Sequence, residues 1–223
     1  MFRVTEVVKH LLFINILMYL GTMLLGDPGP GVMNDLVNER MTDFSNWGRF
    51  RLAMFYPTSD YFRPYQLVSH MFMHSDLRHL FFNMFAIFMF APPLEATWGP
   101  KRFLFYYLFT GFGAALLHTL VRAIDLGGAD TSAFMANVPV LGASGSVFGV
   151  LIGYGMLFPE SRIMLLIPPI PLKAKYFVLI YAGIELFMGL GNFNTGVAHY
   201  AHLGGALFGF LLILYWRRYG SRL

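Results

Sequence analysis

Residues 142–158 read GASGSVFGVLIGYGMLF, an apolar run without a charged side chain. Its length is close to the ~20 residues that cross the hydrocarbon core of a bilayer as a helix. The bilayer interior offers no partner for free backbone N–H and C=O groups, so a crossing segment must satisfy its own hydrogen bonds. The alternation typical of a membrane β-barrel is absent from this continuous run. The stretch therefore predicts a membrane-spanning α-helix.

Similar hydrophobic segments precede and follow this one. The six predicted spans are Val7–Leu25, Leu77–Leu94, Arg102–Ile124, Gly142–Phe158, Tyr176–Leu190 and Val197–Trp216. We therefore expect an all-α polytopic membrane protein with six transmembrane helices. No internal repeat or second domain is visible, so we expect one membrane domain over residues 1–223.

The overall composition agrees with a membrane location. Hydrophobic residues make up 57% of the 223 residues and charged residues 13%, about half the charged share of a typical soluble domain. The absence of cysteine excludes disulfides, thiolate metal sites and a cysteine nucleophile. The formal charge of +4 does not indicate a nucleic-acid partner, because the basic residues flank the predicted spans.

The distribution of basic residues predicts the orientation in the membrane. With the N-terminus inside, the cytoplasmic segments collect Arg3, Lys9, Lys101, Arg102, Arg162, Lys173, Lys175, Arg217, Arg218 and Arg222. This excess follows the positive-inside rule and predicts that both termini are cytoplasmic. The first span resembles a signal peptide in its basic start, but no small-residue cleavage site follows Leu25, so we expect a retained anchor.

Four polar residues lie where the spans should be apolar, namely His79, Asn83, Ser144 and His202. Polar side chains in a span are expensive, and each is therefore a candidate functional residue. The three spans that carry them all run inward from the outer surface, and the residues sit in the first turns. At ~1.5 Å per residue they share a depth of roughly 5–10 Å. Three segments thus bring polar groups to one level.

Ser144 is the candidate nucleophile. It begins a predicted span, where the helix dipole and unpaired N–H groups favour an anion such as an oxyanion. An ordinary N-cap serine is the alternative interpretation. Ser146 is a competing nucleophile, and it also stands where the last glycine of the soluble-hydrolase G-x-S-x-G elbow would be, which argues against that fold.

Glycines on two spans predict close packing of Ser144 and His202. They are Gly145, Gly149 and Gly153 behind the serine, and Gly205 and Gly209 on the histidine's helix face. Small residues let membrane helices approach closely, which would bring an alcohol within reach of the base that it needs. His199, three residues before His202, is the alternative base, although it lies nearer the water boundary.

Two further features have competing interpretations. Several histidines near the outer surface could form a metal site. No HExxH sequence or paired carboxylate accompanies them. Glu185 lies within a span, which is costly for an ionised carboxylate unless it is paired or wet. Either it bonds a neighbouring helix or it helps to hold or gate the fifth span near the site.

Four motifs lie between about Tyr65 and Trp216. They are His70-x3-His74-x4-His79-x3-Asn83, Leu94-Glu95-x3-Gly99-x2-Arg102-Phe103, Gly142-Ala143-Ser144-Gly145, and Ala201-His202-Leu203-Gly204-Gly205-x3-Gly209. In these motifs and their order the sequence resembles the rhomboid family of intramembrane serine proteases.

The resemblance implies a rhomboid-like six-helix bundle and a role for each site residue. Ser144 would attack the substrate carbonyl, and His202 would act as general base and then acid. His79 and Asn83 would stabilise the oxyanion with the Ser144 backbone N–H. It implies a dyad without a required carboxylate, metal or cofactor. The expected partners are transmembrane protein substrates and membrane lipid, whereas the oligomeric state is left open.

Two departures from the family pattern are visible. Tyr65-Gln66 replaces the Trp-Arg of many bacterial members, so the anchoring of the first outer loop differs. Phe148 replaces a tyrosine and can still stack on the imidazole. The compact six-span form suits a bacterial plasma membrane. A catalytically silent relative that binds and escorts membrane proteins is the alternative, and retention of both Ser144 and His202 argues against it. A transporter finds little support.

Overall fold

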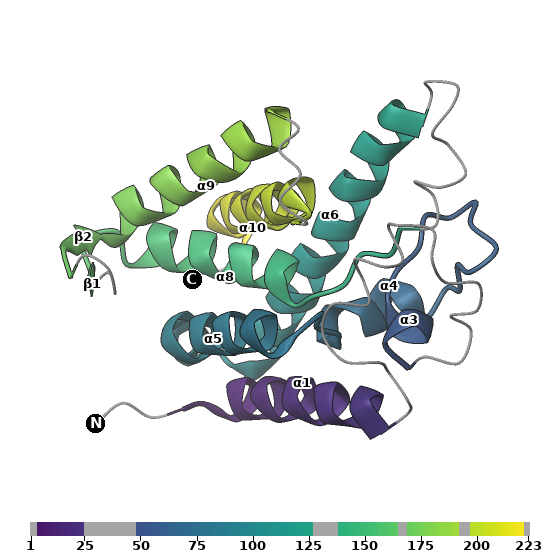
Figure 1. Ribbon diagram of the computed structural model, residues 1–223. Helices are drawn as coiled ribbons and strands as arrows, with labels where there is room; N and C mark the ends of the chain where they lie inside the picture. The colour runs from purple at the N-terminus through teal and green to yellow at the C-terminus, as the bar shows by residue number, and fades with distance from the viewer. Residues whose placement is uncertain (1–3, 25–47, 127–137, 165–168, 192–196, 221–223) are drawn as a thin grey trace. The chain divides into compact units, whose positions relative to one another are not determined.

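The computed structural model describes residues 4–24, 48–126, 138–164, 169–191 and 197–220, and this part of the chain is mostly helical (Figure 1). The longest helices are α1 (Glu6–Leu24), α5 (Leu77–Trp98), α6 (Pro100–Leu126), α8 (Ser144–Leu157), α9 (Ala174–Leu190) and α10 (His199–Tyr219). Each overlaps one predicted span. The largest difference lies at the end of α5, where Leu94 was predicted and Trp98 is observed. The prediction of a helical fold is confirmed.

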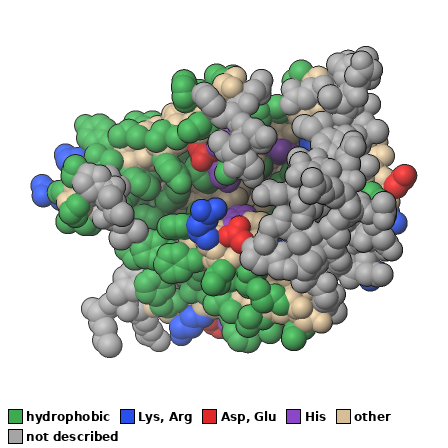
Figure 2. Space-filling model, viewed as in Figure 1, with side chains coloured by type: hydrophobic (Ala, Val, Ile, Leu, Met, Phe, Trp, Pro, Cys, Tyr) green, Lys and Arg blue, Asp and Glu red, His purple; other side chains and the backbone are tan. Residues whose placement is uncertain are grey.

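Four of these helices are long and apolar enough to cross a membrane: α1, α5, α6 over Pro100–Ile124, and α10. Helix α8 is apolar but has 14 residues, and α9 has 17. Large hydrophobic side chains are nevertheless exposed on α9, among them Leu179, Phe187 and Leu190. Figure 2 shows hydrophobic side chains over much of the described surface on one face. The count of six spans stays a prediction.

The chain divides into two compact units. The first contains the described residues of Met1–Val8, Ala86–His118 and Ser144–Leu223. The second contains the described residues of Lys9–Phe85 and Thr119–Ala143.

In the first unit, α8, α9 and α10 pack against one another (Figure 1). Tyr106 of α6 is fully buried and donates a hydrogen bond to the carbonyl of Gly149 on α8 (2.7 Å). At the far end of α8, the Arg217 guanidinium of α10 donates to the Met156 carbonyl (3.0 Å). These bonds attach α6 and α10 to the helix that begins with Ser144.

The turn between α5 and α6 explains one of the sequence motifs. Gly99 separates the two helices with φ +79°, a left-handed conformation that favours glycine. Its N–H bonds the carbonyl of Glu95 (2.8 Å). The buried Glu95 carboxylate accepts bonds from the N–H groups of Val7 (2.9 Å) and Val8 (3.0 Å) and from the Thr5 hydroxyl. It therefore caps the start of α1, where free N–H groups favour an anion.

A small hairpin lies between α8 and α9 and adds a sheet to the predicted all-α fold. Strand β1 (Arg162–Met164) pairs antiparallel with β2 (Pro171–Lys173), with Arg162 opposite Lys173. The exposed Glu160 forms ion pairs with Lys173 (2.6 Å) and Lys175 (2.5 Å). Hydrogen bonds and charge from these lysines lower the pKa of Glu160 to about 2.

The second unit holds the short helices α3 (Gly48–Leu52) and α4 (Gln66–Ser69) and the 3-10 turn η1 (His70–Phe72). Met54 and Val140 exchange two backbone hydrogen bonds of 2.8 Å, which join the segments after α3 and before α8. Gly142, with φ 131°, donates its N–H to the His70 carbonyl (2.9 Å). This bond ties Gly142, two residues before Ser144, to η1.

Candidate active site

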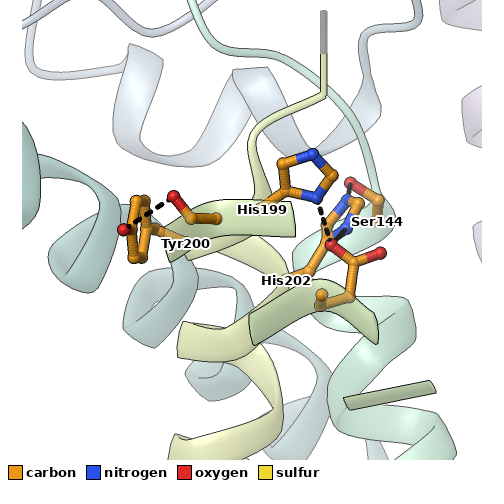
Figure 3. A network of polar contacts seen from close by, with 6 residues as sticks. Ser144, His199, Tyr200 and His202 are labelled. Carbon is orange, nitrogen blue, oxygen red and sulfur yellow. Dashed lines mark hydrogen bonds and ion pairs between the residues drawn. The ribbon is translucent and has the colours of Figure 1, made fainter. Parts of the chain in front are cut away.

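Ser144 and His202 lie within hydrogen-bonding distance. Ser144 is the first residue of α8, and His202 lies in the first turn of α10. The Ser144 Oγ is 2.9 Å from the His202 Nε2. Figure 3 shows the two side chains next to each other. The imidazole is buried, whereas Ser144 is partly exposed. The expected proximity of these two side chains is therefore observed, with the serine open to a reactant.

Aromatic stacking fixes the plane of the His202 ring. The Phe148 ring lies parallel to the imidazole, with centroids 4.3 Å apart and 10° between the planes. Tyr181 of α9 also stacks on Phe148, at 5.2 Å and 6°. The phenylalanine thus keeps the stacking that we expected of it, one turn after Ser144 on α8.

The glycines of α10 allow the close approach of α8. A Cβ at Gly205 would overlap the carbonyl oxygen of Gly145, so any side chain there would push the helices apart. A Cβ at Gly209 would lie 3.2 Å from the Gly149 Cα. The prediction that these glycines bring α10 close to α8 is confirmed.

The glycines of α8 also meet α6, a second neighbour that we did not expect. A Cβ at Gly145 would overlap Ala114, and a Cβ at Gly149 would lie 2.5 Å from the Thr110 Cβ, both on α6. Helix α8 therefore receives α6 side chains as well as the backbone of α10. Residues at positions i and i+4 share one face of a helix. Where they are glycines, one neighbouring helix can pack on that face while a second approaches the exposed backbone from the side.

The Glu185 carboxylate approaches both histidines at the start of α10. Its Oε2 is 2.7 Å from the His199 Nδ1 and 3.0 Å from the His202 Nδ1. The His199 contact is a hydrogen bond. The His202 contact has ion-pair distance without the direction of a hydrogen bond, and among the described residues no other partner reaches that buried nitrogen. Sequence reasoning gave His202 no acidic neighbour, because Glu185 lies on a different helix.

The geometry separates the alternative nucleophile and base from the main pair. The Ser146 hydroxyl is buried and donates to the Tyr107 carbonyl (2.9 Å). The His199 Nδ1 bonds Glu185, and the next residue, Tyr200, donates its hydroxyl to the Gly189 carbonyl of α9 (3.0 Å), also drawn in Figure 3. These bonds hold the start of α10 against α9. The Ser144 contact is made by His202.

The same cluster contains donors that a metal ion could use. Among the described residues, Glu185, His199 and His202 each offer a ligand atom within 4.8 Å of the others. Two imidazoles and a carboxylate are a ligand set that zinc accepts. A metal on the Nδ1 of His202 would leave the proton on Nε2, because a neutral imidazole carries one proton. Metal binding there and a base role for Nε2 are therefore mutually exclusive.

His79 and Asn83, the expected oxyanion donors, belong to the second unit. The His79 Nδ1 lies 3.1 Å from the Ser75 hydroxyl, and the Asn83 amide donates to the His79 carbonyl (3.0 Å). The His79 N–H bonds the Asp76 carboxylate (2.8 Å), which caps the start of α5. Their part in stabilising an oxyanion stays a prediction.

Two more histidines of the second unit are buried beside these residues. Burial lowers the pKa of His70 to about 4. Burial and the nearby His79 lower the pKa of His74 to about 3. The His70 Nδ1 lies 2.7 Å from the Gln66 carbonyl, so this ring is a neutral donor inside the fold. Of the two, His74 lies beside His79, with ring centroids 5.0 Å apart.

The Rhomboid domain model matches residues 61–219, which include α5 to α10 with Ser144 and His202. The chain belongs to the rhomboid family. With its apolar helices, this rhomboid is an integral membrane protein.

Several curated proteins resemble this rhomboid. "Rhomboid protein 1, mitochondrial" of Saccharomyces cerevisiae is 30% identical over 150 residues, which cover 65% of this chain and 40% of the yeast protein. "Rhomboid protease AarA" of Providencia stuartii is 27% identical over 151 residues, which cover 64% of this chain and 52% of that protein. "Rhomboid-like protein 11, chloroplastic" of Arabidopsis thaliana is 30% identical over 156 residues, which cover 67% of this chain and 51% of the plant protein.

The chain thus spans about half the length of these relatives or less. Their names include mitochondrial and chloroplastic members beside a protease from Providencia stuartii. The relatives therefore do not single out a bacterial plasma membrane for this rhomboid, and that part of the predicted location is unsupported.

Proposed function

We propose that this rhomboid is a serine endopeptidase that cleaves transmembrane or juxtamembrane segments of membrane proteins. The observation that carries the proposal is the 2.9 Å contact between the Ser144 Oγ and the His202 Nε2. An alcohol is a weak nucleophile until an adjacent base takes its proton. Membership of the rhomboid family, together with the relative named as a rhomboid protease, supports the same reaction class.

The reaction would proceed in two acyl transfers. The Ser144 Oγ forms a bond to the scissile carbonyl carbon as its proton passes to the His202 Nε2. The imidazolium returns that proton to the leaving amine as the C–N bond breaks, which leaves a serine ester. Water then attacks the ester as His202 takes its proton, and the imidazolium gives that proton to the Ser144 Oγ as the ester C–O bond breaks, which releases the carboxyl product and the free serine.

The tetrahedral intermediate needs donors for its oxyanion. Ser144 begins α8, where backbone N–H groups lack intrahelical partners and the dipole favours negative charge. We assign the Ser144 N–H, the His79 imidazole and the Asn83 amide to this role. Removal of one such donor costs about 10²–10³-fold in kcat in a soluble serine protease.

The proposal includes the setting of the reaction. The chain would form one rhomboid domain with six spans, and both termini would lie on the side that carries the basic residues. Substrates would be membrane proteins that reach Ser144 through the bilayer. Exposed hydrophobic side chains on α9 and α10 are suited to lipid contact.

Cleavage of a model transmembrane substrate by the purified protein tests the proposal. Wild type should cleave, and Ser144→Ala and His202→Ala should each lose activity by several orders of magnitude. Binding of the substrate by wild type without cleavage would instead support a catalytically silent escort protein.

The metal-binding donor set favours one alternative, a metal-dependent membrane hydrolase centred on Glu185, His199 and His202. A chelator distinguishes the two mechanisms. The serine mechanism predicts unchanged cleavage in EDTA, and inhibition by added Zn²⁺ that EDTA reverses. Loss of wild-type cleavage in EDTA, restored by Zn²⁺, would replace the serine mechanism with the metal one.

A further inference from the structure

We propose that Glu185 is a positioning residue that completes a Ser144–His202–Glu185 triad. The inference rests on the proposed function and deepens it, because a Ser–His dyad needs no carboxylate. Glu185 would act through the imidazole of His202, orienting it and stabilising its positive charge. The side chain comes from α9, whereas the serine and the histidine come from α8 and α10.

The geometry places the three groups in series. The Glu185 Oε2 lies 3.0 Å from the Nδ1 of His202, and the opposite nitrogen, Nε2, lies 2.9 Å from the Ser144 Oγ. Each imidazole nitrogen thus has one neighbour of the kind that a triad requires. The Glu185 side chain is 9% exposed and the His202 side chain 11%, so little water competes with the contact.

Tautomer chemistry gives the carboxylate its first effect. A neutral imidazole carries one proton, and its free lone pair must face Ser144 for Nε2 to act as a base. A carboxylate beside Nδ1 favours the tautomer with the proton on that nitrogen. The 3.0 Å between Oε2 and Nδ1 is already within the range of a hydrogen bond.

The negative charge of the Glu185 carboxylate has a second effect, on the protonated form of His202. When His202 accepts the serine proton, a cation forms among buried side chains, where an unpaired charge is costly. The Phe148 ring covers one face of the imidazole and offers only its π face. A carboxylate at 3.0 Å offsets that cost and lowers the barrier to proton transfer.

A purely structural role for Glu185 accounts for only part of the arrangement. Its hydrogen bond with the His199 Nδ1, 2.7 Å long, is enough to fasten α9 to the start of α10. That bond also fixes the carboxylate, and the same oxygen then lies beside His202. Among the described residues, the titratable groups seen beside the imidazole are His199 on its own helix and Glu185 on α9, of which Glu185 is the acid near Nδ1.

The test is the pH dependence of cleavage by Glu185→Gln, which keeps the shape and removes the charge. We expect kcat to fall about tenfold or more, within the ~10⁴-fold loss known for an orienting carboxylate in a soluble triad, with KM changed less than about twofold. The acid limb of the kcat/KM profile should move to lower pH, because the imidazolium loses a stabilising neighbour. A smaller fall in kcat, or an unmoved limb, would overturn the proposal.

Two further variants separate positioning from folding. Glu95→Gln removes another buried carboxylate of the same unit, one that binds backbone N–H groups rather than a histidine. It should lower the melting temperature and leave the acid limb in place. Glu185→Asp keeps the charge on a shorter side chain. The acid limb of its kcat/KM profile should therefore match that of wild type, whereas its kcat should fall. Wild-type kcat in Glu185→Asp, or the same limb shift in Glu95→Gln, would contradict the inference.

Failure of the triad and failure of the serine mechanism give different results. If Ser144→Ala retains cleavage, the serine mechanism itself is wrong. If Ser144→Ala is inactive and Glu185→Gln keeps wild-type kcat and pH profile, the serine mechanism stands and the triad does not.

Discussion

The side-chain amide of Gln66 is fully engaged with backbone groups of the second unit. Its Nε2 donates to the carbonyls of Arg51 (3.0 Å) and Tyr61 (3.1 Å), and its Oε1 accepts from the Arg63 N–H (3.0 Å). The side chain is 1% exposed. An amide thus anchors the segment where the family resemblance led us to expect a different anchor from Trp-Arg.

Gln66→Leu should therefore destabilise the second unit. The substitution roughly keeps the volume and removes three part-buried hydrogen bonds, each worth about 0.5–1.5 kcal/mol. We expect a clearly lower melting temperature in detergent. Tyr65→Phe, which changes the exposed neighbouring side chain, is the control and should melt like wild type. Equal melting of Gln66→Leu and wild type would contradict the anchoring role.

Burial of His70 and His74 makes stability depend on pH. Their folded-state pKa values, about 4 and about 3, lie below the ~6.5 of an unfolded histidine. Between these values the unfolded state binds more protons, so their contribution is complete above pH ~6.5 and declines as the pH falls toward the folded values.

Lowering the pH from 7 to 5 should cost about 2 kcal/mol of unfolding free energy per histidine. This window lies above the range in which ordinary carboxylates titrate. His74→Phe removes one of the two groups and should flatten the dependence by about half, as measured by thermal unfolding at several pH values. The same pH dependence in wild type and His74→Phe would show that His74 does not titrate as described.

Individual residues were predictable where a motif carried them. Ser144 and His202 stood out because each is polar at the start of an apolar span, and their contact followed from the glycines around them. Glu185 was noticed for the same reason, but its partner was not, because sequence spacing carries no information on contacts between α9 and α10. The common depth of Glu185 and His202 below the outer surface was the available signal.

At the scale of helices, the packing of α10 on α8 holds the serine and the histidine together. Gly205 faces the Gly145 carbonyl oxygen, one residue after Ser144. Gly205→Ala should therefore cost about 1–3 kcal/mol of stability through overpacking. It should also reduce cleavage at least tenfold, since a shift well below 1 Å alters the serine–histidine contact. Melting temperature and kcat/KM measure the two effects.

Gly183→Ala on α9 is the matched control. A Cβ there meets nothing within 4 Å, and alanine favours a helix over glycine by roughly 1 kcal/mol. This variant should be as stable as wild type or slightly more so, with unchanged cleavage. Similar losses in Gly205→Ala and Gly183→Ala would mean that helix propensity, not the contact with α8, explains the result.

Helix positions were predictable because continuous apolar runs identify them, and the ends of the helices differ from the predicted ones by a few residues. Which faces meet was less predictable. The glycines of α8 receive Ala114 and Thr110 of α6 in addition to α10, whereas the sequence suggested α10 alone. Small residues on a helix indicate that another helix packs closely there, but they do not identify which helix it is. The β1–β2 hairpin was missed because its strands are only three residues each.

At the scale of the whole molecule, the topology depends on how many helices cross the membrane. Length and composition mark α1, α5, α6 and α10 as candidate spans, whereas α8 and α9 are shorter. If α8 and α9 also cross, the β1–β2 hairpin lies on the same side as the N-terminus. If they do not, three crossings precede it and it lies on the opposite side.

Cysteine accessibility in sealed vesicles measures this directly, because the chain has no cysteine of its own. We expect Ile170→Cys, exposed beside β2, to react from the side of the N-terminus. Asp60→Cys, in the segment between α1 and α5, should react from the opposite side. Labelling of both positions from one side would contradict the six-span topology.

The central claim is that Ser144 is a nucleophile activated by His202, and one measurement tests it most directly. The purified protein is treated with a fluorophosphonate that labels activated serines, and the modified residue is identified by mass spectrometry. The account predicts a single adduct on Ser144 that is absent from Ser144→Ala and strongly reduced in His202→Ala. An adduct on another serine such as Ser146, or full labelling of Ser144 without His202, would contradict it.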